Sequence, residues 1–180
     1  MRRDVNLNLG CGHDILPGWR NVDARPGLGV DLIRDLDRPY ALHGIPTASV
    51  LRVRAMALFE HLFHWEALML EIARVLEPGT GMLDLLVPLG VLNLAPYHVR
   101  IFGPNTFDPY LSDVRSANGS CEFDGVQYFT KWRGWTEHYF PFSWHLARRF
   151  GRKVYALPLT RPHNLYLELR RNERPWRDGA

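Results

Sequence analysis

VNLNLGCGHDILPGWRNVD, residues 5–23, sets the architecture predicted for this chain. Val5–Leu9 alternates apolar and polar residues, as a β-strand does, and runs directly into Gly10-Cys11-Gly12. A second short apolar run, Trp19–Val22, ends in Asp23. A glycine turn after a first strand and an acid after a second, parallel strand are typical of nucleotide-type binding sites.

The glycine turn and Asp23 have separate chemical roles in such a site. Glycine lets the backbone turn sharply and approach a ligand with no Cβ in the way. A carboxylate at the tip of the second strand can accept hydrogen bonds from both cis hydroxyls of a ribose. Ile15 stands where a dinucleotide turn carries a third glycine, and no Gly-Lys-Ser/Thr segment follows. The pattern favours a nucleoside with an uncharged or amino-acid tail, although Gly-x-Gly alone also fits an ordinary tight turn.

The composition is that of an ordinary globular chain. Its 180 residues suffice for one domain with a substantial core, and 46% are hydrophobic and 23% charged. The formal net charge is +3 and the basic residues form no stripe, so a nucleic-acid partner is not expected. No signal peptide or long apolar run occurs, so we expect a cytoplasmic protein without membrane contact, as a monomer or homodimer.

The number and spacing of the cysteines and histidines indicate whether disulfides or metal sites are expected. Cys11 and Cys121 are the only cysteines, and Cys11 lies in the glycine turn. A structural disulfide is therefore not expected, and a reducing compartment fits. The eight histidines are scattered and no Cys-x-x-Cys occurs, so the sequence predicts no metal site.

Changes of hydrophobic period predict the remaining elements of the first half. Val30–Leu36 alternates acidic and aliphatic residues and predicts a third strand with Asp35 near its carboxyl end; Ser49–Met56 predicts a fourth strand. From Glu60 to Leu76 the apolar residues recur on one face at helical spacing. The mostly apolar run Gly81–Val87, ended by a proline, indicates a strand buried on both faces in a parallel sheet.

The second half has weaker patterns. The alternating run Lys153–Leu159 is separated from a terminal strand by Arg161-Pro162. The other elements predicted there are a short helix at Phe107–Val114, an edge strand with its turn in Cys121–Trp135, a helix at Pro141–Phe150 and the terminal strand Asn164–Leu169. Together the two halves predict an α/β fold, doubly wound and Rossmann-like, with a mostly parallel sheet and an antiparallel C-terminal strand.

Five segments resemble the small class I S-adenosylmethionine-dependent methyltransferases, in particular the short bacterial and phage type. The resemblance covers residues 5–88 well and the remainder loosely, and its strength lies in the order and spacing of the segments. They are Leu7–Gly12 (LNLGCG), Leu16–Asp23 (LPGWRNVD), Asp35-Leu36, Phe59–Leu62 (FEHL) and Arg74–Gly79 (RVLEPG).

The resemblance implies S-adenosylmethionine as cofactor and S-adenosylhomocysteine as product. It implies a single domain over residues 1–180, with a cofactor-binding half (1–88), an acceptor-side half (89–172) and a loose tail (173–180). The cofactor-binding residues it implies are Gly10, Cys11 and Gly12 under the methionine part, Asp23 at the ribose hydroxyls, Asp35 and Leu36 at the adenine, and Met56 and Ala57 on the sulfonium side. His13 is expected to touch the cofactor's carboxylate or amine, or to cap the turn.

Three features depart from the family's pattern. Many relatives carry a histidine where this chain has Ala57 and an acid near Leu51 or Ala48, and Thr80 stands in place of the usual second glycine after Pro-Gly. Ala57 is close to the expected site, so this departure bears on catalytic competence rather than on the fold.

Methyl transfer from a sulfonium is an in-line displacement with a good, neutral leaving group. The protein mainly positions the nucleophile and excludes water, and a base is needed only if the acceptor must lose a proton. The candidate catalytic residues are His61, near the start of the predicted helix, and His98 and Arg100, after the fifth strand; ordinary helix and surface positions are the alternatives. Aromatic residues that could line an acceptor pocket, or simply pack, are Tyr97, Tyr128, Trp132 and Trp135.

A small-molecule or sugar acceptor is preferred over nucleic acid, because the net charge is low and unclustered. Two other classes remain open. One is a non-catalytic binding module that acts through a partner, motivated by Ala57, Arg52 and Arg54. The other is a nucleotide-dependent oxidoreductase on a Rossmann sheet, against which the missing third glycine argues.

Overall fold

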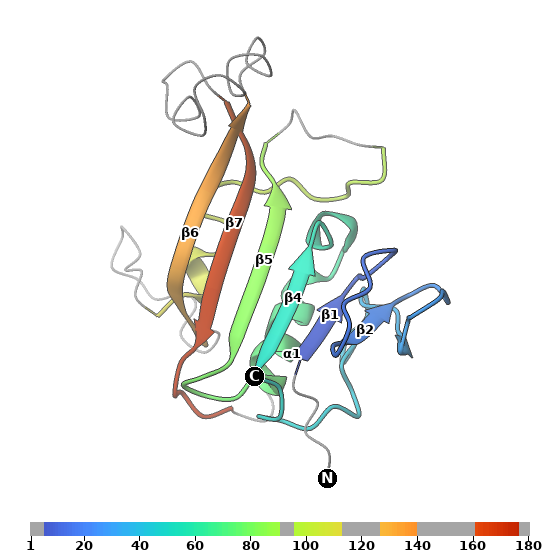
Figure 1. Ribbon diagram of the computed structural model, residues 1–180. Helices are drawn as coiled ribbons and strands as arrows, with labels where there is room; N and C mark the ends of the chain where they lie inside the picture. The colour runs from blue at the N-terminus through green and yellow to red at the C-terminus, as the bar shows by residue number, and fades with distance from the viewer. Residues whose placement is uncertain (1–5, 91–95, 113–126, 140–160, 177–180) are drawn as a thin grey trace.

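A computed structural model describes residues 6–90, 96–112, 127–139 and 161–176 of the chain. They form one seven-stranded sheet in the order β3-β2-β1-β4-β5-β7-β6 (Figure 1). Strands β1 to β5 run parallel, whereas β7 runs antiparallel to both of its neighbours, β5 and β6. The sheet confirms the predicted Rossmann-like α/β class with an antiparallel C-terminal strand.

The elements follow the predicted order along the chain. The strands are β1 (Asn6–Leu9), β2 (Arg20–Asp23), β3 (Leu32–Ile33), β4 (Arg52–Met56), β5 (Met82–Pro88), β6 (Phe129–Tyr139) and β7 (Arg161–Arg171). The helices are the 3-10 turns η1 (Phe59–His61) and η3 (Asp108–Tyr110) and the α-helix α1 (Trp65–Val75). Within the described ranges, no helix is long and apolar enough to span a membrane.

Helix α1 packs on one face of the sheet and buries the apolar stripe that the sequence predicts (Figure 1). Trp65, Leu68, Met69 and Ile72 are all buried. The helix begins later than the predicted Glu60, because residues 59–61 form the separate turn η1. Leu76, directly after α1, forms an isolated parallel bridge with Val50, two residues before β4, so the end of the helix is tied to the start of that strand.

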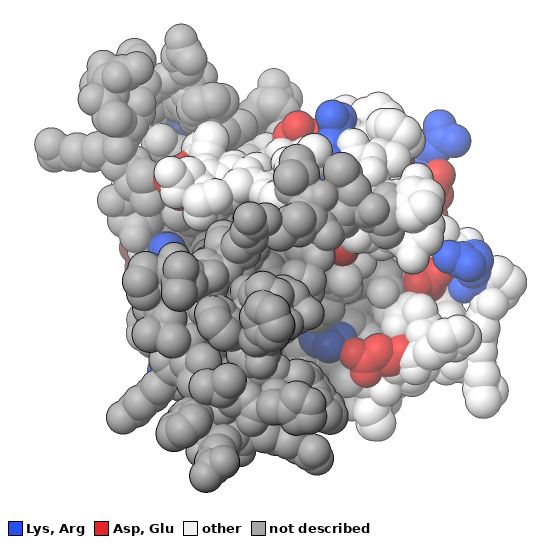
Figure 2. Space-filling view, turned by 90° about the horizontal axis from the view of Figure 1, so that it is seen from above, with Lys and Arg blue, Asp and Glu red and all other residues white. Residues whose placement is uncertain are grey.

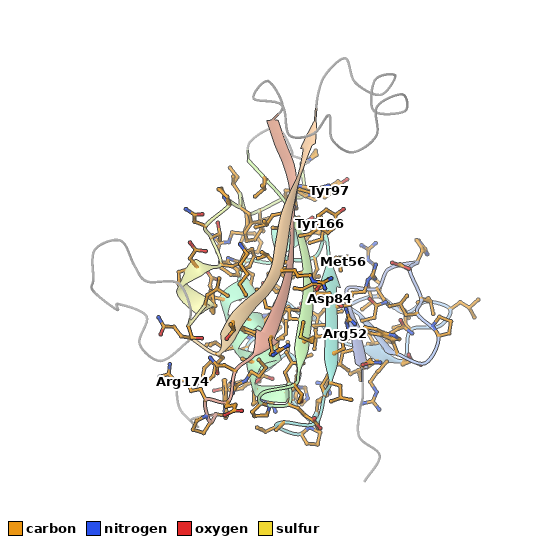
Figure 3. The ribbon with its side chains drawn as sticks, turned by 60° about the vertical axis from the view of Figure 1, so that its left-hand side comes forward. Arg52, Met56, Asp84, Tyr97, Tyr166 and Arg174 are labelled. Atoms are coloured by element: carbon orange, nitrogen blue, oxygen red, sulfur yellow. The ribbon has the colours of Figure 1, made fainter. Side chains whose placement is uncertain are left out.

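Strand β5 differs from the prediction of burial on both faces. Its side chains alternate, with Leu83, Leu85 and Val87 buried in the core and the intervening residues half-buried. Figure 3 shows Arg52 on β4 and Asp84 on β5 side by side, where Arg52 Nε and Nη2 donate to the two carboxylate oxygens at 2.6 and 2.9 Å. The face opposite α1 is therefore polar at this point, which the apolar composition of β5 does not predict.

Side chains, rather than a helix, organise the residues between β1 and β2. The described chain forms turns there and no helix. Asn8 Nδ2 donates to the carbonyl of Asp14 at 2.7 Å and to Asn21 Oδ1 at 3.0 Å, and Asn21 Oδ1 also accepts from the Leu16 amide at 3.0 Å. Asn8 and Asn21 are buried, so these bonds satisfy groups that would otherwise be costly to desolvate.

The C-terminal elements differ from the prediction in two ways. Arg161 and Pro162 lie inside β7 and pair with β6 instead of separating two strands. The proline lies beyond residues 164–170, with which β5 pairs, so no ladder bond to β5 is lost at Pro162, and the β6 register shifts between Glu137 and His138. Strand β6 forms the sheet edge, as predicted for the aromatic segment, and begins at Phe129.

The residues that follow β7 contact the rest of the domain up to Trp176, and residues 177–180 of the predicted loose tail lie outside the described residues. The Arg171 guanidinium is 1% exposed and donates to the Arg174 carbonyl at 2.7 Å. The Trp176 ring lies 5.1 Å from the ring of Tyr128. Of the predicted helix at Phe107–Val114, the described residues 107–112 contain only the turn η3. The predicted helix Pro141–Phe150 and run Lys153–Leu159 lie outside the described residues.

Candidate functional site

A pocket of about 600 Å³ lies at the carboxyl ends of β1, β2 and β4, where a switch of strand order places ligands in such sheets. Figure 2 looks onto this edge and shows individual acidic and basic side chains among uncharged ones, with no broad area of one charge in the described part. The pocket is lined by Gly10, Gly12, Asp23, Ala24, Arg25, Asp35, Leu36, Ala57, Leu58, His61, Leu62 and Tyr97.

Asp23 at the tip of β2 has a fixed carboxylate. Its Oδ2 accepts from the Gly12 amide and its Oδ1 from the Arg25 amide, each at 2.9 Å. Each carboxylate oxygen retains acceptor capacity beyond these bonds. Two fixed acceptors at the mouth of a glycine turn can hold two neighbouring hydroxyl groups, as the sequence predicts for a ribose.

Gly10 and Gly12 both adopt left-handed backbone conformations, with φ of +62° and +51°. A Cβ on Gly10 would lie 2.7 Å from Leu58 Cδ1, so this glycine permits the turn to pack against the residues after β4. A Cβ on Gly12 would meet nothing within 4 Å, so Gly12 leaves open space on the pocket side. Gly10 therefore permits close packing, whereas Gly12 leaves the backbone open toward the pocket.

Cys11 and Met56 belong to the predicted cofactor set but are not among the lining residues. Cys11 is buried, and its amide donates to the Val22 carbonyl at 3.1 Å. Burial raises the pKa of the Cys11 thiol, and the nearby negative charge of Asp23 raises it further. His13 borders a second, adjoining cavity of about 780 Å³ that shares Gly12 and Asp23 with the first.

Asp35 and Leu36 both line the pocket, on the side that the resemblance assigns to adenine. Asp35 Oδ1 accepts from the Asp37 amide and Oδ2 from Arg38 Nε, each at 3.0 Å. These two hydrogen bonds, the backbone one first, hold the pKa of Asp35 below its ordinary value. Leu36 is buried and offers an apolar surface on which a flat ring can pack.

Ala57 lies at the end of β4 in a left-handed conformation, with φ of +50°. Its amide donates to the Leu86 carbonyl at 3.0 Å, which continues the β4–β5 ladder into the pocket wall. An alanine in this conformation is strained, and strain of this kind gathers at functional sites.

The structure brings His61 and His98 together on one wall of the pocket. Their rings are 4.9 Å apart between centroids and meet edge to face, and His61 itself lines the pocket. Arg100, the third predicted catalytic residue, points elsewhere: its Nη2 donates to the carbonyl of Phe63 at 2.5 Å, and it is not a lining residue. Tyr97 lines the pocket, whereas Tyr128 is buried against Arg171 in the core. The side chains of Trp132 and Trp135 lie outside the described part.

Sequence reasoning missed Glu60 and the Asn8–Asn21 network. Glu60 is 1% exposed and lies next to the paired histidines. An acid immediately before a histidine, at the start of a buried helix, was a visible signal. Asn8 could also have been noticed in the sequence, because it is a polar residue between two leucines that are fully buried in the structure.

The arginines that motivated a binding module are engaged within the domain. Arg52 pairs with Asp84, and Arg54 pairs with Asp14 at 2.8 Å and donates to Asn8 Oδ1 at 3.1 Å. The ion pair between Arg54 and Asp14 supports the loop that follows the glycine turn. Neither arginine is therefore available as an unpaired surface charge for a partner.

Comparison with known proteins identifies the fold. No protein-family model matches the chain, and no curated protein sequence is significantly similar to it. Solved structures do match: the YcgJ protein of Bacillus subtilis superposes with a TM-score of 0.57 at 14% identity, covering 97% of this chain and 94% of that one. An S-adenosylmethionine-dependent methyltransferase from Mesorhizobium loti matches with a TM-score of 0.50 at 18% identity, covering 95% and 94%.

A third match is the 1,6-didemethyltoxoflavin-N1-methyltransferase of Burkholderia thailandensis, solved with its substrate and S-adenosylhomocysteine. It has a TM-score of 0.51 at 13% identity and covers 95% of this chain and 72% of that one. The chain therefore has the fold of the small class I S-adenosylmethionine-dependent methyltransferases, as the sequence resemblance implies.

Proposed function

We propose that this protein binds S-adenosylmethionine in the pocket at the carboxyl edge of the sheet and transfers its methyl group to a small-molecule or sugar acceptor. The observation that carries the proposal is the Asp23 carboxylate, held by the Gly12 and Arg25 amides at the mouth of the glycine turn. The donor set fits the cofactor, because it offers hydroxyl acceptors at Asp23, an apolar wall at Leu36 and an open backbone at Gly12.

When bound, S-adenosylmethionine supplies an electrophilic methyl group and is released as S-adenosylhomocysteine. The residues of this chain bind and orient: Asp23 fixes the ribose end, and Asp35 with Leu36 holds the base. His61, which lines the same pocket, is the residue proposed to contact the acceptor. Arg100 acts as a positioning residue, since its bond to Phe63 ties the segment carrying His98 to the end of η1. The preference for a small-molecule or sugar acceptor over nucleic acid rests on the low net charge of +3 and on the lack of a basic stripe in the sequence.

Calorimetry with S-adenosylmethionine and S-adenosylhomocysteine tests the binding step. We expect micromolar affinity, about −8 kcal/mol. Asp23→Ala removes two charge-assisted hydrogen bonds and should weaken binding by about tenfold or more. Glu66→Gln, an exposed acid on α1 away from the pocket, is the matched control and should bind as the unmodified chain does. Equal affinity for Asp23→Ala and the control would reject this site.

The second candidate is a non-catalytic methyltransferase-fold module that acts through a partner. It is favoured by Ala57, which stands where many relatives carry a histidine, and by Arg100, whose guanidinium is occupied by Phe63. Methyl transfer to any of a panel of small hydroxyl, amine and thiol acceptors would eliminate this candidate. Tight cofactor binding without turnover, on a panel that includes sugars, would favour it.

A further inference from the structure

Glu60, His61 and His98 form a cluster at the wall of the cofactor pocket. One ligand atom from each, a carboxylate oxygen and two ring nitrogens, lie within 4.8 Å of one another. The segments are far apart in sequence but are tied together, because the amides of Val99 and Arg100 both bond the Glu60 carbonyl, at 2.8 and 3.3 Å. We propose that this cluster is a binding site for a divalent transition-metal ion of the Zn²⁺ class.

Glu60 supplies the first argument. Its side chain is 1% exposed, and its Oε2 has no hydrogen-bond partner within the part of the chain that the structure describes. A buried carboxylate oxygen without a partner is costly, and a cation is the ligand that removes this cost. Desolvation raises the pKa of Glu60, and its own backbone amide and the two histidines oppose this shift.

His61 supplies the second, independent argument. Its Nδ1 lies 3.2 Å from the carbonyl oxygen of Tyr97. A carbonyl can only accept, so Nδ1 is the donor in this contact, and in the neutral ring Nε2 then holds the lone pair. This is the arrangement that orients histidine ligands in metal sites, where the nitrogen that does not bind the metal donates to a carbonyl or carboxylate.

The donor set indicates the kind of metal. Two imidazoles and one carboxylate suit Zn²⁺, Co²⁺, Ni²⁺ or Fe²⁺, whereas Mg²⁺ and Ca²⁺ prefer oxygen ligands throughout. Zn²⁺ bonds of about 2.1 Å place tetrahedral ligands about 3.4 Å apart, so ligand atoms that now lie within 4.8 Å of one another would move closer together when an ion binds. Three protein ligands leave one position for water or a substrate atom, and His61 borders the pocket on that side.

The sequence does not predict this site, because His98 follows β5 and is far along the chain from Glu60 and His61 in η1. The alternative explanation of this cluster is that the buried acid interacts with the two histidines and that no ion binds. It makes a different prediction, since metal would then have no effect on the folded protein.

The test uses the full chain after treatment with a chelator and its removal, without S-adenosylmethionine. Titration with Zn²⁺ by calorimetry, and with Co²⁺ by visible absorption, should show one equivalent bound with tetrahedral-type Co²⁺ bands. Zn²⁺ should also raise the melting temperature. Mg²⁺ should show no binding by calorimetry and should leave the melting temperature unchanged. Glu60→Gln and His98→Gln should each lower Zn²⁺ affinity by about 100-fold or more, since even an outer partner is worth 10- to 100-fold.

His43→Ala is the matched control, because His43 is exposed and outside the cluster, and it should bind Zn²⁺ like the unmodified chain. His98→Gln, at a half-buried position, keeps the test decisive if Glu60→Gln fails to fold. Absence of binding, or binding that survives both substitutions, would overturn the proposal. The outcome is separate from that of the proposed function, because metal binding and cofactor binding are measured on separate samples.

Discussion

At the scale of single residues, Gly10 and Gly12 have the same backbone conformation but different surroundings. Gly10→Ala should lower the free energy of unfolding by about 2 to 4 kcal/mol, because left-handed strain adds to overpacking against Leu58, 2.7 Å away. Gly12→Ala should cost only the strain, about 1 to 2 kcal/mol, since its Cβ meets nothing. Urea unfolding monitored by circular dichroism measures both, and an equal loss in the two variants would contradict this assignment.

Cys11 should react slowly with thiol reagents, and its pH dependence should reveal its environment. The thiolate is the reactive form, and a raised pKa lowers its fraction at any given pH. In a Cys121→Ser background, the alkylation rate should therefore keep rising beyond pH 9, past the ordinary thiol pKa of about 8.5. Iodoacetamide kinetics from pH 7 to 10 provide the measurement, with free cysteine as reference. A plateau below pH 8.5 would show an activated rather than a buried thiol.

Several site residues could be read from sequence because their role is local. Gly10, Gly12 and Asp23 come from one strand–turn–strand segment, and the structure places all three at the same pocket. Glu60 and His98 could not be paired in this way, since their contact depends on how the segment after β5 returns over η1. Glu60 is unusual because its carboxyl group is buried. This burial results from the packing of the whole core and cannot be read from the residues next to Glu60 in sequence.

At the scale of elements, α1 does more than cover the sheet. Glu71, predicted simply as helix, is buried and accepts from Arg74 Nε at 2.7 Å and from the Leu42 amide at 3.2 Å. Arg74 also donates to the carbonyls of Ile45 and Leu42, at 2.8 and 3.1 Å. This pair therefore fixes the β3–β4 connection onto the helix.

Arg74→Met should destabilise the protein by about 3 kcal/mol or more, because it leaves the buried Glu71 charge without its partner. The double variant Glu71→Gln/Arg74→Met should be closer to the unmodified chain, since no charge is left uncompensated. A double-mutant cycle by chemical denaturation measures the coupling. Additive losses would mean that the two side chains contribute independently. Glu66→Gln on the exposed face of α1 serves as the control.

The elements with a strong hydrophobic periodicity could be predicted from the sequence, whereas the residues at which they begin and end could not. The apolar stripe of α1 identifies the helix, but its start depends on η1, which tertiary contacts form. In β7, the local rule that proline ends a strand was overridden, because Pro162 lies where β5 no longer pairs. The alternation of β5 was hidden in the sequence, since half of its outward residues are also apolar.

At the scale of the whole molecule, the last residue of β7 and the segment after it connect the sheet to helix α1 and to the region of β6. Arg171 donates to the Ala73 carbonyl on α1 at 2.8 Å as well as to Arg174, and Asn172 Nδ2 donates to the Gln127 carbonyl at 2.9 Å. Burial lowers the pKa of Arg171, which nevertheless stays charged at neutral pH.

A chain ending at Asn172 should lose about 2 to 4 kcal/mol of stability, because it removes the Arg174 carbonyl from a buried guanidinium and the Trp176 ring from Tyr128. A chain ending at Trp176 keeps both contacts and should unfold at the same urea concentration as the full chain. Equal midpoints for the two truncations would show that this segment adds nothing to the fold.

The connection between β1 and β2 has a consequence for the order of events during folding. A helix forms within its own residues in microseconds, whereas the bonds joining Asn8, Asn21 and Arg54 close only after three strands lie side by side. We therefore expect the glycine turn to acquire its shape late in folding, after the transition state. A ligand that recognises this turn should slow unfolding while leaving the folding rate unchanged.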